Sequence, residues 1–281
     1  MKLTYLGTAA AEGWPAAFCN CDGCRAARRL GGRNIRTRSQ ALVDDALLLD
    51  FPCDAWLHAL RQGLDFSAVR WLLVTHSHTD HFYPAELVNR GGCYSHGMKS
   101  PTLDIFCNEA VRDYFYKAAG HELVPDVEQR LRFHIVRPFE CVSAGPYRVT
   151  PLPAKHMDTE QALFYLIERE GRSLLYAHDT GRFYPEVYEF LAGRAAPLSA
   201  VSLDSTSGRF ENGENDPLIY ISSVKKYPLS LALRMTLDLG SAAAWNEIFA
   251  MSVLSILPPV LLFFAGQKYF IQGISTSGLK G

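Results

Sequence analysis

The fold is decided by one stretch of the sequence, Trp71-Leu72-Leu73-Val74-Thr75-His76-Ser77-His78-Thr79-Asp80-His81-Phe82-Tyr83-Pro84. Its first four residues are apolar and predict a buried strand. Pro84 predicts the start of a helix, where its missing N–H costs nothing. Between the two lie four side chains that bind metals, namely His76, His78, Asp80 and His81. Imidazole and carboxylate suit Zn, Mn or Fe, so a metal site is predicted where this strand ends.

The alternative interpretation of this stretch is a polar turn with scattered histidines. The chain has 9 His in 281 residues, so three of them within six positions are improbable by chance. The metal site is therefore the favoured interpretation.

Three later segments repeat the arrangement of a strand that ends near a potential ligand. A strand at 147–153 is followed by His156, one at 173–178 by Asp179, and one at 200–203 by Asp204. Several strand ends that meet at one rim are a common way to build a metal site on β-structure. His178 competes with Asp179 as the ligand of its segment.

A shorter strand at 47–49 ends on Asp50. Two roles remain open for this carboxylate. It either hydrogen-bonds a metal-ligating histidine from behind or only caps a turn.

Three thiols, Cys19, Cys21 and Cys24, lie within six residues and could wrap one tetrahedral zinc ion if a fourth ligand came from elsewhere. The alternative is an incidental run of small residues. Seven Cys and no segment resembling a signal peptide indicate a reduced, cytoplasmic compartment. The remaining cysteines should pack as small hydrophobes, and three isolated histidines should be surface or structural residues. These are Cys53, Cys93, Cys107 and Cys141, and His96, His121 and His134.

The basic run 25–38 predicts a solvated helix and loop, and attraction of an anionic substrate is its second interpretation. The net charge of −1 gives no sign of a polyanionic partner, and no nucleic-acid binding is expected. Composition changes near Asp216. Residues 217–281 hold five Lys or Arg, two Asp or Glu and neither His nor Cys. We therefore expect two parts, 1–216 and 217–281.

The pattern H-x-H-x-D-H at 76–81, followed by His156 and Asp179, resembles the metallo-β-lactamase superfamily of binuclear metallohydrolases. The Gly7-Thr8 turn, the Cys19, Cys21 and Cys24 cluster, and Pro151-Leu152-Pro153 before His156 narrow the resemblance to the phosphodiesterase branch typified by PhnP. The resemblance implies an α/β fold, an αββα sandwich with its metal site at one edge of the paired sheets. It also implies a structural zinc on the three cysteines.

The same resemblance implies two divalent ions, Zn or Mn, and a role for each ligand. His76, His78 and His156 would bind the first ion, Asp80 and His81 the second, and Asp179 would bridge them. A hydroxide bridging the two ions would attack the phosphorus of a small phosphate ester, including cyclic phosphates, with Asp80 as proton acceptor. Alternative substrates within the superfamily are RNA, a lactone or a thioester.

The sequence departs from the family after the strand at 200–203. The family has one more His there, whereas this chain has none after His178. The sandwich is therefore expected to be incomplete at its C-terminal end, the second ion under-ligated and the activity weakened or absent.

Residues 217–281 resemble the C-terminus of permease subunits of sugar ABC importers, such as the maltose and glycerol-phosphate permeases. The match rests on 227–233, on Pro258-Pro259 and on the ending 272–281. The uncharged run 248–265 is long enough for a transmembrane helix and predicts inner-membrane association, and a buried core helix is its alternative. A third hypothesis is therefore a membrane-associated permease fragment, or a non-functional gene fusion at Asp216/Pro217.

Overall fold

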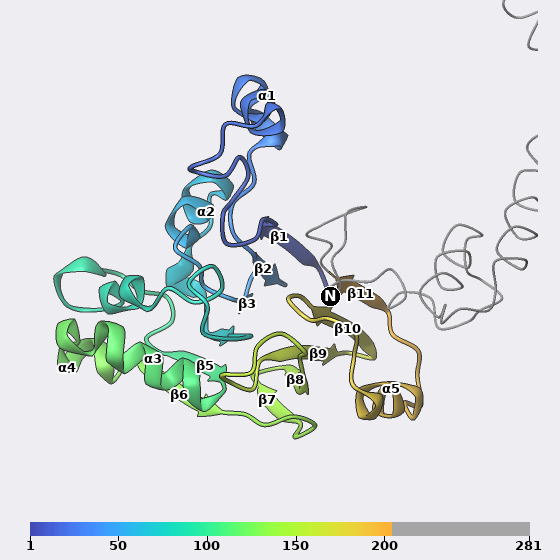
Figure 1. The fold of residues 1–281 in the computed structure, drawn as a ribbon. Helices are drawn as coiled ribbons and strands as arrows, with labels where there is room; N and C mark the ends of the chain where they lie inside the picture. Colours follow the sequence, from blue (N-terminus) through green and yellow to red (C-terminus); the bar gives the residue numbers. More distant parts are fainter. Residues whose placement is uncertain (204–281) are drawn as a thin grey trace, which may run out of the picture. The chain divides into compact units, whose positions relative to one another are not determined.

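The computed structural model describes residues 1–203 of the chain. The chain divides into two units, Met1–Asp216 and Pro217–Gly281, and the second lies outside the described residues. Figure 1 shows the arrangement of the first unit, in which helices flank two β-sheets.

The first sheet has six strands in the order of the sequence. Its N-terminal strands β1 to β3 are antiparallel neighbours, and β3 to β6 run parallel. The strands are β1 Leu3–Gly7, β2 Gln40–Val43, β3 Leu47–Leu49, β4 Trp71–Leu73, β5 Leu103–Cys107 and β6 Leu131–Ile135.

The second sheet has five strands in the order β11-β10-β9-β8-β7. Its pairs are antiparallel except β10 with β11, which is parallel. The strands are β7 Val142–Ala144, β8 Tyr147–Pro153, β9 Leu163–Arg169, β10 Arg172–Ala177 and β11 Ala200–Leu203.

The described helices lie mostly in the connections of the first sheet (Figure 1). The α-helices are α1 Asp22–Leu30, α2 Ala55–Gln62, α3 Glu109–Ala119, α4 Pro125–Glu128 and α5 Pro185–Ala192. The 3-10 helices are η1 Gly32–Asn34, η2 Phe66–Ala68, η3 Pro84–Asn89, η4 Gly92–Tyr94 and η5 Gly120–Glu122.

Alternation along the strands builds two cores, because successive side chains of a strand point to opposite faces. Leu47 and Leu49 of β3 pack between the two sheets, together with Tyr165 of β9. Leu48 faces the other way, into the layer that contains Phe115 of α3. Each fully buried side chain of this size contributes about 1.5–3 kcal/mol. The sandwich therefore holds both sheets rigidly behind the rim where β3, β4, β8 and β10 end.

The expected αββα sandwich is confirmed. The side chain of Asn108 caps α3 by accepting a hydrogen bond from Val111 N at 2.9 Å. The helix predicted to open at Pro84 is a short 3-10 helix, η3.

One group of predictions is wrong. Only Cys107 among the isolated cysteines is packed inside, whereas Cys53, Cys93 and Cys141 are exposed. Cys53 lies in the turn before α2, Cys93 in the short helix η4 and Cys141 directly before β7. None of them occupies a core-facing strand position, and hydrophobicity alone does not bury a residue of a surface connection.

The predictions for the C-terminal part fall outside the described residues. These are the transmembrane helix at 248–265, the permease-like segment and the boundary at Asp216/Pro217. Within residues 1–203, no helix is long and apolar enough to cross a membrane.

Candidate metal centre

The rim of the sandwich gathers the predicted ligands from three strands. β4 ends at Leu73 and runs into the loop that carries His76, His78, Asp80 and His81. β8 ends at Pro153 before His156, and β10 ends at Ala177 before Asp179. The β4 loop turns sharply because His81 N and Phe82 N both donate to the carbonyl oxygen of His78, at 2.9 and 2.7 Å.

Three histidines aim their ring nitrogens at one point. His76 Nε2 lies 3.0 Å from His78 Nδ1, and His156 Nε2 lies 3.2 Å from the same atom. Zn–N bonds of about 2.0–2.1 Å in a tetrahedron place neighbouring ligand atoms about 3.3 Å apart. The spacing of the three nitrogens therefore fits a shared cation.

A second group shares His76 and adds His81 and Asp179. Asp179 Oδ2 lies 2.8 Å from His81 Nε2, 3.7 Å from His76 Nε2 and 3.8 Å from His156 Nε2. Asp80 lies at the edge of this group, with its Oδ2 3.6 Å from His81 Nε2. One carboxylate oxygen, that of Asp179, thus touches both groups.

A buried hydrogen-bond chain fixes two of these rings. Asp50 is fully buried and accepts hydrogen bonds from Thr75 N at 2.8 Å and from His81 Nδ1 at 2.8 Å. Thr75 Oγ1 donates to Asp50 at 3.0 Å and lies 2.9 Å from His76 Nδ1. With a cation bound, His76 and His81 would both keep their proton on Nδ1, which leaves the lone pairs on Nε2 to face the cation. Of the two roles open for Asp50, the structure shows the support of a histidine.

Burial and charge act on the rings in opposite ways. Burial lowers the pKa of His76 well below its usual value, and the charge of His81 adds to this. Burial also acts against charge on His81, yet the carboxylates of Asp50 and Asp179 raise its pKa well above the usual value. The carboxylates concentrate negative charge at the rim, which favours a cation there.

Asp179, and not its neighbour His178, lies among the imidazoles. His178 is buried, stacks on Tyr176 at 4.0 Å between ring centres, and pairs with Ser202 Oγ at 2.8 Å and Ser39 Oγ at 3.3 Å. Burial first, and then the charge of His81, lower its pKa to about 4. His178 is therefore a neutral, structural residue.

Sequence reasoning missed Glu160, which secures the loop of the first group. Its Oε1 accepts from Ser77 N at 2.8 Å and from Ser77 Oγ at 2.6 Å, and its Oε2 accepts from Asn108 at 2.9 Å. The only available signal was its position four residues after His156, which is too weak to single it out.

The donor set passes the test of fit to a divalent metal. Three ring nitrogens that converge at 3.0–3.2 Å cannot all be satisfied by hydrogen bonds to one another, because each neutral ring has one N–H. Neutral imidazoles and carboxylates are ligands for Zn, Mn or Fe. The histidine and aspartate cluster therefore fits a metal site.

The cysteine cluster forms a second candidate site at the N-terminus of α1. The sulfurs of Cys19, Cys21 and Cys24 all lie within 4.8 Å of one another. A backbone hydrogen bond from Cys24, together with contacts to the thiols of Cys19 and Cys24, lowers the pKa of Cys21 to about 7. The thiolate is the form that binds metals, so the cluster fits a zinc ion. In the described residues it has three members.

The three isolated histidines lie away from both clusters, as expected. His96, His121 and His134 are exposed, and His134 pairs with Asp104 at 2.7 Å.

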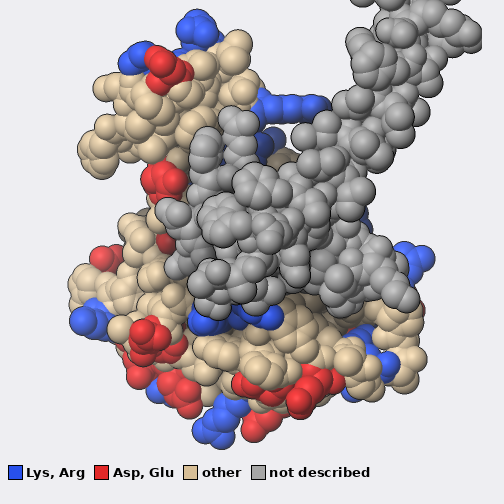
Figure 2. All heavy atoms as spheres, turned by 45° about the vertical axis from the view of Figure 1, so that its right-hand side comes forward, with Lys and Arg blue, Asp and Glu red and all other residues tan. Residues whose placement is uncertain are grey.

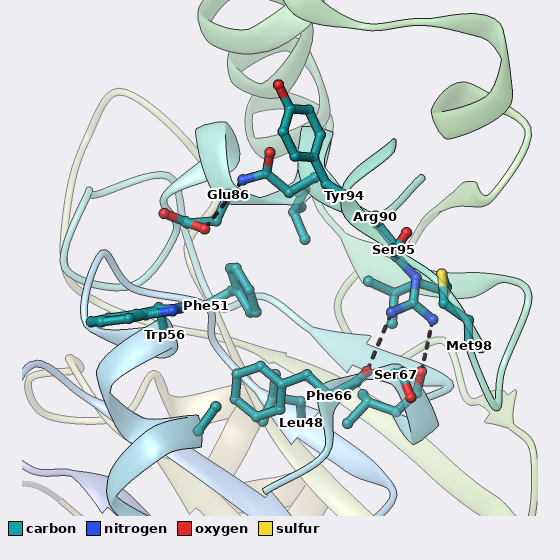
Figure 3. A pocket seen from close by; sticks show the side chains of 15 residues that line it. Leu48, Phe51, Trp56, Phe66, Ser67, Glu86, Arg90, Tyr94, Ser95 and Met98 are labelled. Atoms are coloured by element: carbon teal, nitrogen blue, oxygen red, sulfur yellow. Dashed lines mark hydrogen bonds between the residues drawn. The ribbon is translucent and has the colours of Figure 1, made fainter. Parts of the chain in front are cut away.

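An apolar pocket of about 350 Å³ lies on the helix side of the first sheet (Figure 3). Phe51, Phe66 and Leu87 line it, and it contains none of the predicted metal ligands. Arg90 crosses its wall and donates to the carbonyl oxygens of Phe66, Val69, Ser100 and Thr102. Burial, and then the charge of Arg130, lower the pKa of Arg90 to about 10. Arg90 thus joins loops, and the pocket is distinct from the metal centre.

The sequence profile of the beta-lactamase superfamily domain matches residues 50–211, more than half of the chain. The chain therefore belongs to this superfamily, whose members with this fold are metal-binding and generally hydrolases. The matched range contains every predicted ligand of the histidine and aspartate cluster.

Comparisons with individual proteins agree with this assignment. The chain is 26% identical over 232 residues to coenzyme PQQ synthesis protein B of Methylobacterium radiotolerans, covering 73% of each. Its fold is similar to that of Zn²⁺-bound PqqB from Methylobacterium extorquens, with a TM-score of 0.56, 20% identity and 73% of each chain covered. It is also similar to a diphosphatase from the PhnP family, with a TM-score of 0.55, 20% identity, and 71% of this chain and 72% of that one covered.

Proposed function

We propose that this protein is a metal-dependent phosphodiesterase that uses two divalent ions. One observation carries the proposal, the position of Asp179 Oδ2 within 3.8 Å of ring nitrogens from both ligand groups. A carboxylate in that position can share one cation with His76, His78 and His156, and another with His81. When bound, a pair of cations lowers the pKa of water and neutralises charge on phosphoryl oxygens.

Each residue has a stated task in this proposal. His76, His78 and His156 hold the first ion, and Asp80 and His81 hold the second, which lacks a further histidine from 204–281 because that range has none. Asp80 lies at the edge of the cluster, with its Oδ2 3.6 Å from His81 Nε2, and in this proposal it accepts the proton of the attacking water. Asp50 keeps His81 oriented.

Phosphate chemistry is favoured over other hydrolyses by the fold relatives. One similar structure is a diphosphatase of the PhnP family. Another is the short form of human tRNase Z, with a TM-score of 0.50, 16% identity, and 78% of this chain and 85% of that one covered. These activities are those named for the two relatives, and they support the proposal of phosphoryl transfer for this chain.

Hydrolysis of bis(p-nitrophenyl) phosphate by the full chain loaded with Zn²⁺ or Mn²⁺ tests the proposal. We expect metal-dependent release of p-nitrophenol that chelation abolishes and that metal restores. A panel with a precursor RNA, a lactone and a thioester discriminates the other substrates of the superfamily. Turnover of the lactone or the thioester, with none of either phosphodiester, would reject the phosphodiesterase and keep the hydrolase. Turnover of the RNA alone would keep the phosphodiesterase and identify RNA as its substrate.

A second candidate is a role in cofactor synthesis like that named for the Methylobacterium relative. The sequence match over 232 residues favours it. Complementation of a strain lacking that relative tests this role, and growth only with the wild-type chain would support it.

For the cysteine cluster we propose a structural zinc ion. Its thiolates come from one turn at the start of α1, where Arg28 donates to the carbonyl oxygens of Cys19 and Ala16, both at 2.7 Å. These bonds fix the loop that presents the thiols.

For residues 217–281 we propose a permease-derived segment joined to the hydrolase part, on the sequence resemblance alone. Genomic sequencing across Asp216/Pro217 tests the junction, and two separate genes there would refute it. Detergent-phase partition of the full chain tests membrane association through 248–265, and recovery in the aqueous phase would refute that.

A further inference from the structure

A cleft of about 550 Å³ opens beside Asp179, between the strand ends and the N-terminal loops. The N-terminal lobe, here residues 8–38, forms one wall of it. Figure 2 shows basic side chains at the tip of the lobe that carries α1 and at its base. The residues that line it include Tyr5, Glu12, Trp14, Arg33, Arg36 and Asp179.

Backbone hydrogen bonds hold the two segments of the lobe together. Trp14 N donates to Arg36 O at 2.9 Å, and Arg36 N donates to Trp14 O at 2.7 Å. Thr8 N and Ala9 N both donate to the carbonyl oxygen of Thr37, at 2.9 and 2.8 Å. Trp14 and Arg36 are therefore presented from a paired backbone, so their spacing is defined before a ligand binds.

Three arginines of this segment differ in their partners. Arg38 is engaged by protein groups. Its Nη1 donates to the two carboxylate oxygens of Asp54, at 3.3 and 3.2 Å, and its Nε donates to the carbonyl oxygen of Ala11 at 3.0 Å. Arg33 and Arg36 line the cleft and form no ion pair with any carboxylate in residues 1–203. Glu12 and Asp179 are the carboxylates of the cleft. Arg38 thus has a structural role, whereas Arg33 and Arg36 have no carboxylate partner within residues 1–203.

Aromatic rings accompany the two cations. Tyr5 is 45% exposed and Trp14 is 40% exposed, although both line the cleft. A half-exposed ring beside guanidinium groups offers a stacking surface for a planar group, while each guanidinium presents a fork of donors that matches phosphate oxygens.

We propose that Arg33 and Arg36 form an anion subsite for a second phosphate group, so that the substrate class is a nucleotide-like phosphodiester or diphosphate. The inference rests on the proposed function, because it places the scissile phosphate at Asp179. Trp14 and Tyr5 contact the planar part of the substrate.

Binding to the metal-loaded full chain tests the subsite without turnover. The probes are thymidine 5′-monophosphate and thymidine 3′,5′-bisphosphate, which differ by one phosphate, and the readout is isothermal titration calorimetry. We expect the wild type to bind the bisphosphate about tenfold more tightly, as charge-assisted hydrogen bonds to phosphate imply. Arg33→Gln/Arg36→Gln should bind both probes equally, and the preference of the wild type should fall as salt rises.

Arg29→Gln is the matched control, because Arg29 is an exposed arginine of α1 that does not line the cleft. It should keep the preference for the bisphosphate. An unchanged preference in Arg33→Gln/Arg36→Gln, an equal loss in Arg29→Gln, or no preference in the wild type would overturn the subsite.

Hydrolysis assays separate this inference from the proposed function. A chain that prefers the bisphosphate but cleaves no phosphodiester supports the subsite and refutes the phosphodiesterase. A chain that cleaves bis(p-nitrophenyl) phosphate but shows no bisphosphate preference refutes the subsite and supports the phosphodiesterase.

Discussion

The histidine and aspartate cluster and the cysteine cluster are two candidate metal sites built in different ways. The first collects side chains from β4, β8 and β10, which are far apart in the sequence, and buries His76 and His81 to 1% exposure. The second takes all its thiols from six consecutive residues, with Cys21 exposed. A buried cluster whose side chains are held by hydrogen bonds can bind a metal in one geometry. A cluster from consecutive residues requires only that its own loop is folded.

The two clusters depend on different parts of the fold. Asp50, Thr75 and Glu160 hold the histidine loop from the core side, so that site depends on the whole sandwich. The cysteine loop is held by Arg28 of the adjoining helix. We therefore expect chemistry at the first cluster and local stabilisation at the second.

The largest expected effect comes from removing ligands of the first cluster. His78→Ala/Asp179→Ala should lower kcat/KM for bis(p-nitrophenyl) phosphate by more than about 100-fold, beyond the effect typical of residues that only support ligands. His121→Ala, a change at an exposed histidine, should leave the rate unchanged. Steady-state kinetics at fixed metal concentration measure both, and equal activity of the double variant would contradict the assignment.

A smaller effect is expected when support is removed but the ligands stay. Asp50→Asn keeps the shape of the side chain, but it loses the charge beside His81, so the metal affinity should fall about 10–100-fold. Metal titration with a competing chelator measures this affinity.

Asp104→Asn is the matched control for that change. Asp104 also pairs with a histidine, His134, at 2.7 Å, but at an exposed position. Equal metal affinities of the two variants would mean that Asp50 supports the fold and not the metal centre.

The second cluster should affect metal content and stability more than turnover. Cys21→Ser should remove about one zinc ion per chain and lower Tm by about 2–4 °C, while kcat on bis(p-nitrophenyl) phosphate changes less than about threefold. Cys141→Ser, at an exposed isolated cysteine, should leave the zinc content, Tm and kcat unchanged. A collapse of kcat in Cys21→Ser would place the cysteine cluster in the reaction.

The smallest effect concerns a buried histidine that lies in neither cluster. His58 Nδ1 donates to Gln40 Oε1 at 2.6 Å, and His58 Nε2 lies 2.7 Å from Thr37 Oγ1. Burial lowers its pKa to about 4. Between pH 6.5 and 4 the unfolded chain therefore binds a proton at His58 that the folded chain does not bind. The free energy of unfolding falls as the pH falls through that window.

His58→Gln should remove that part of the pH dependence. Between pH 7.5 and 5 the free energy of unfolding should fall by about 1 kcal/mol more in the wild type than in the variant. Urea unfolding at the two pH values measures the difference, and identical pH dependence would show that His58 titrates normally.

The sequence predicted the fold and the grouping of the candidate ligands because both leave short patterns. The H-x-H-x-D-H stretch and strands that end on His156 and Asp179 can be recognised without coordinates, and the structure places those side chains together. Asp50 left two roles open, because only the fold shows that Thr75 and His81 face it.

Other features depend on tertiary contacts and leave no local pattern. Glu160 reaches Ser77 and Asn108 across the two sheets, and no spacing in the sequence relates the three. Likewise the basic run 25–38 does not reveal that Arg38 is paired while Arg33 and Arg36 line a cleft.

Metal content tests the central claim most directly, that imidazoles and carboxylates from distant strand ends hold divalent ions. The test uses the full chain with Cys21→Ser, so that the cysteine cluster does not contribute zinc, and counts ions per chain by elemental mass spectrometry. We predict bound divalent metal in this variant and almost none once His78→Ala and Asp179→Ala are added. Equal metal content with and without those two changes would contradict the account.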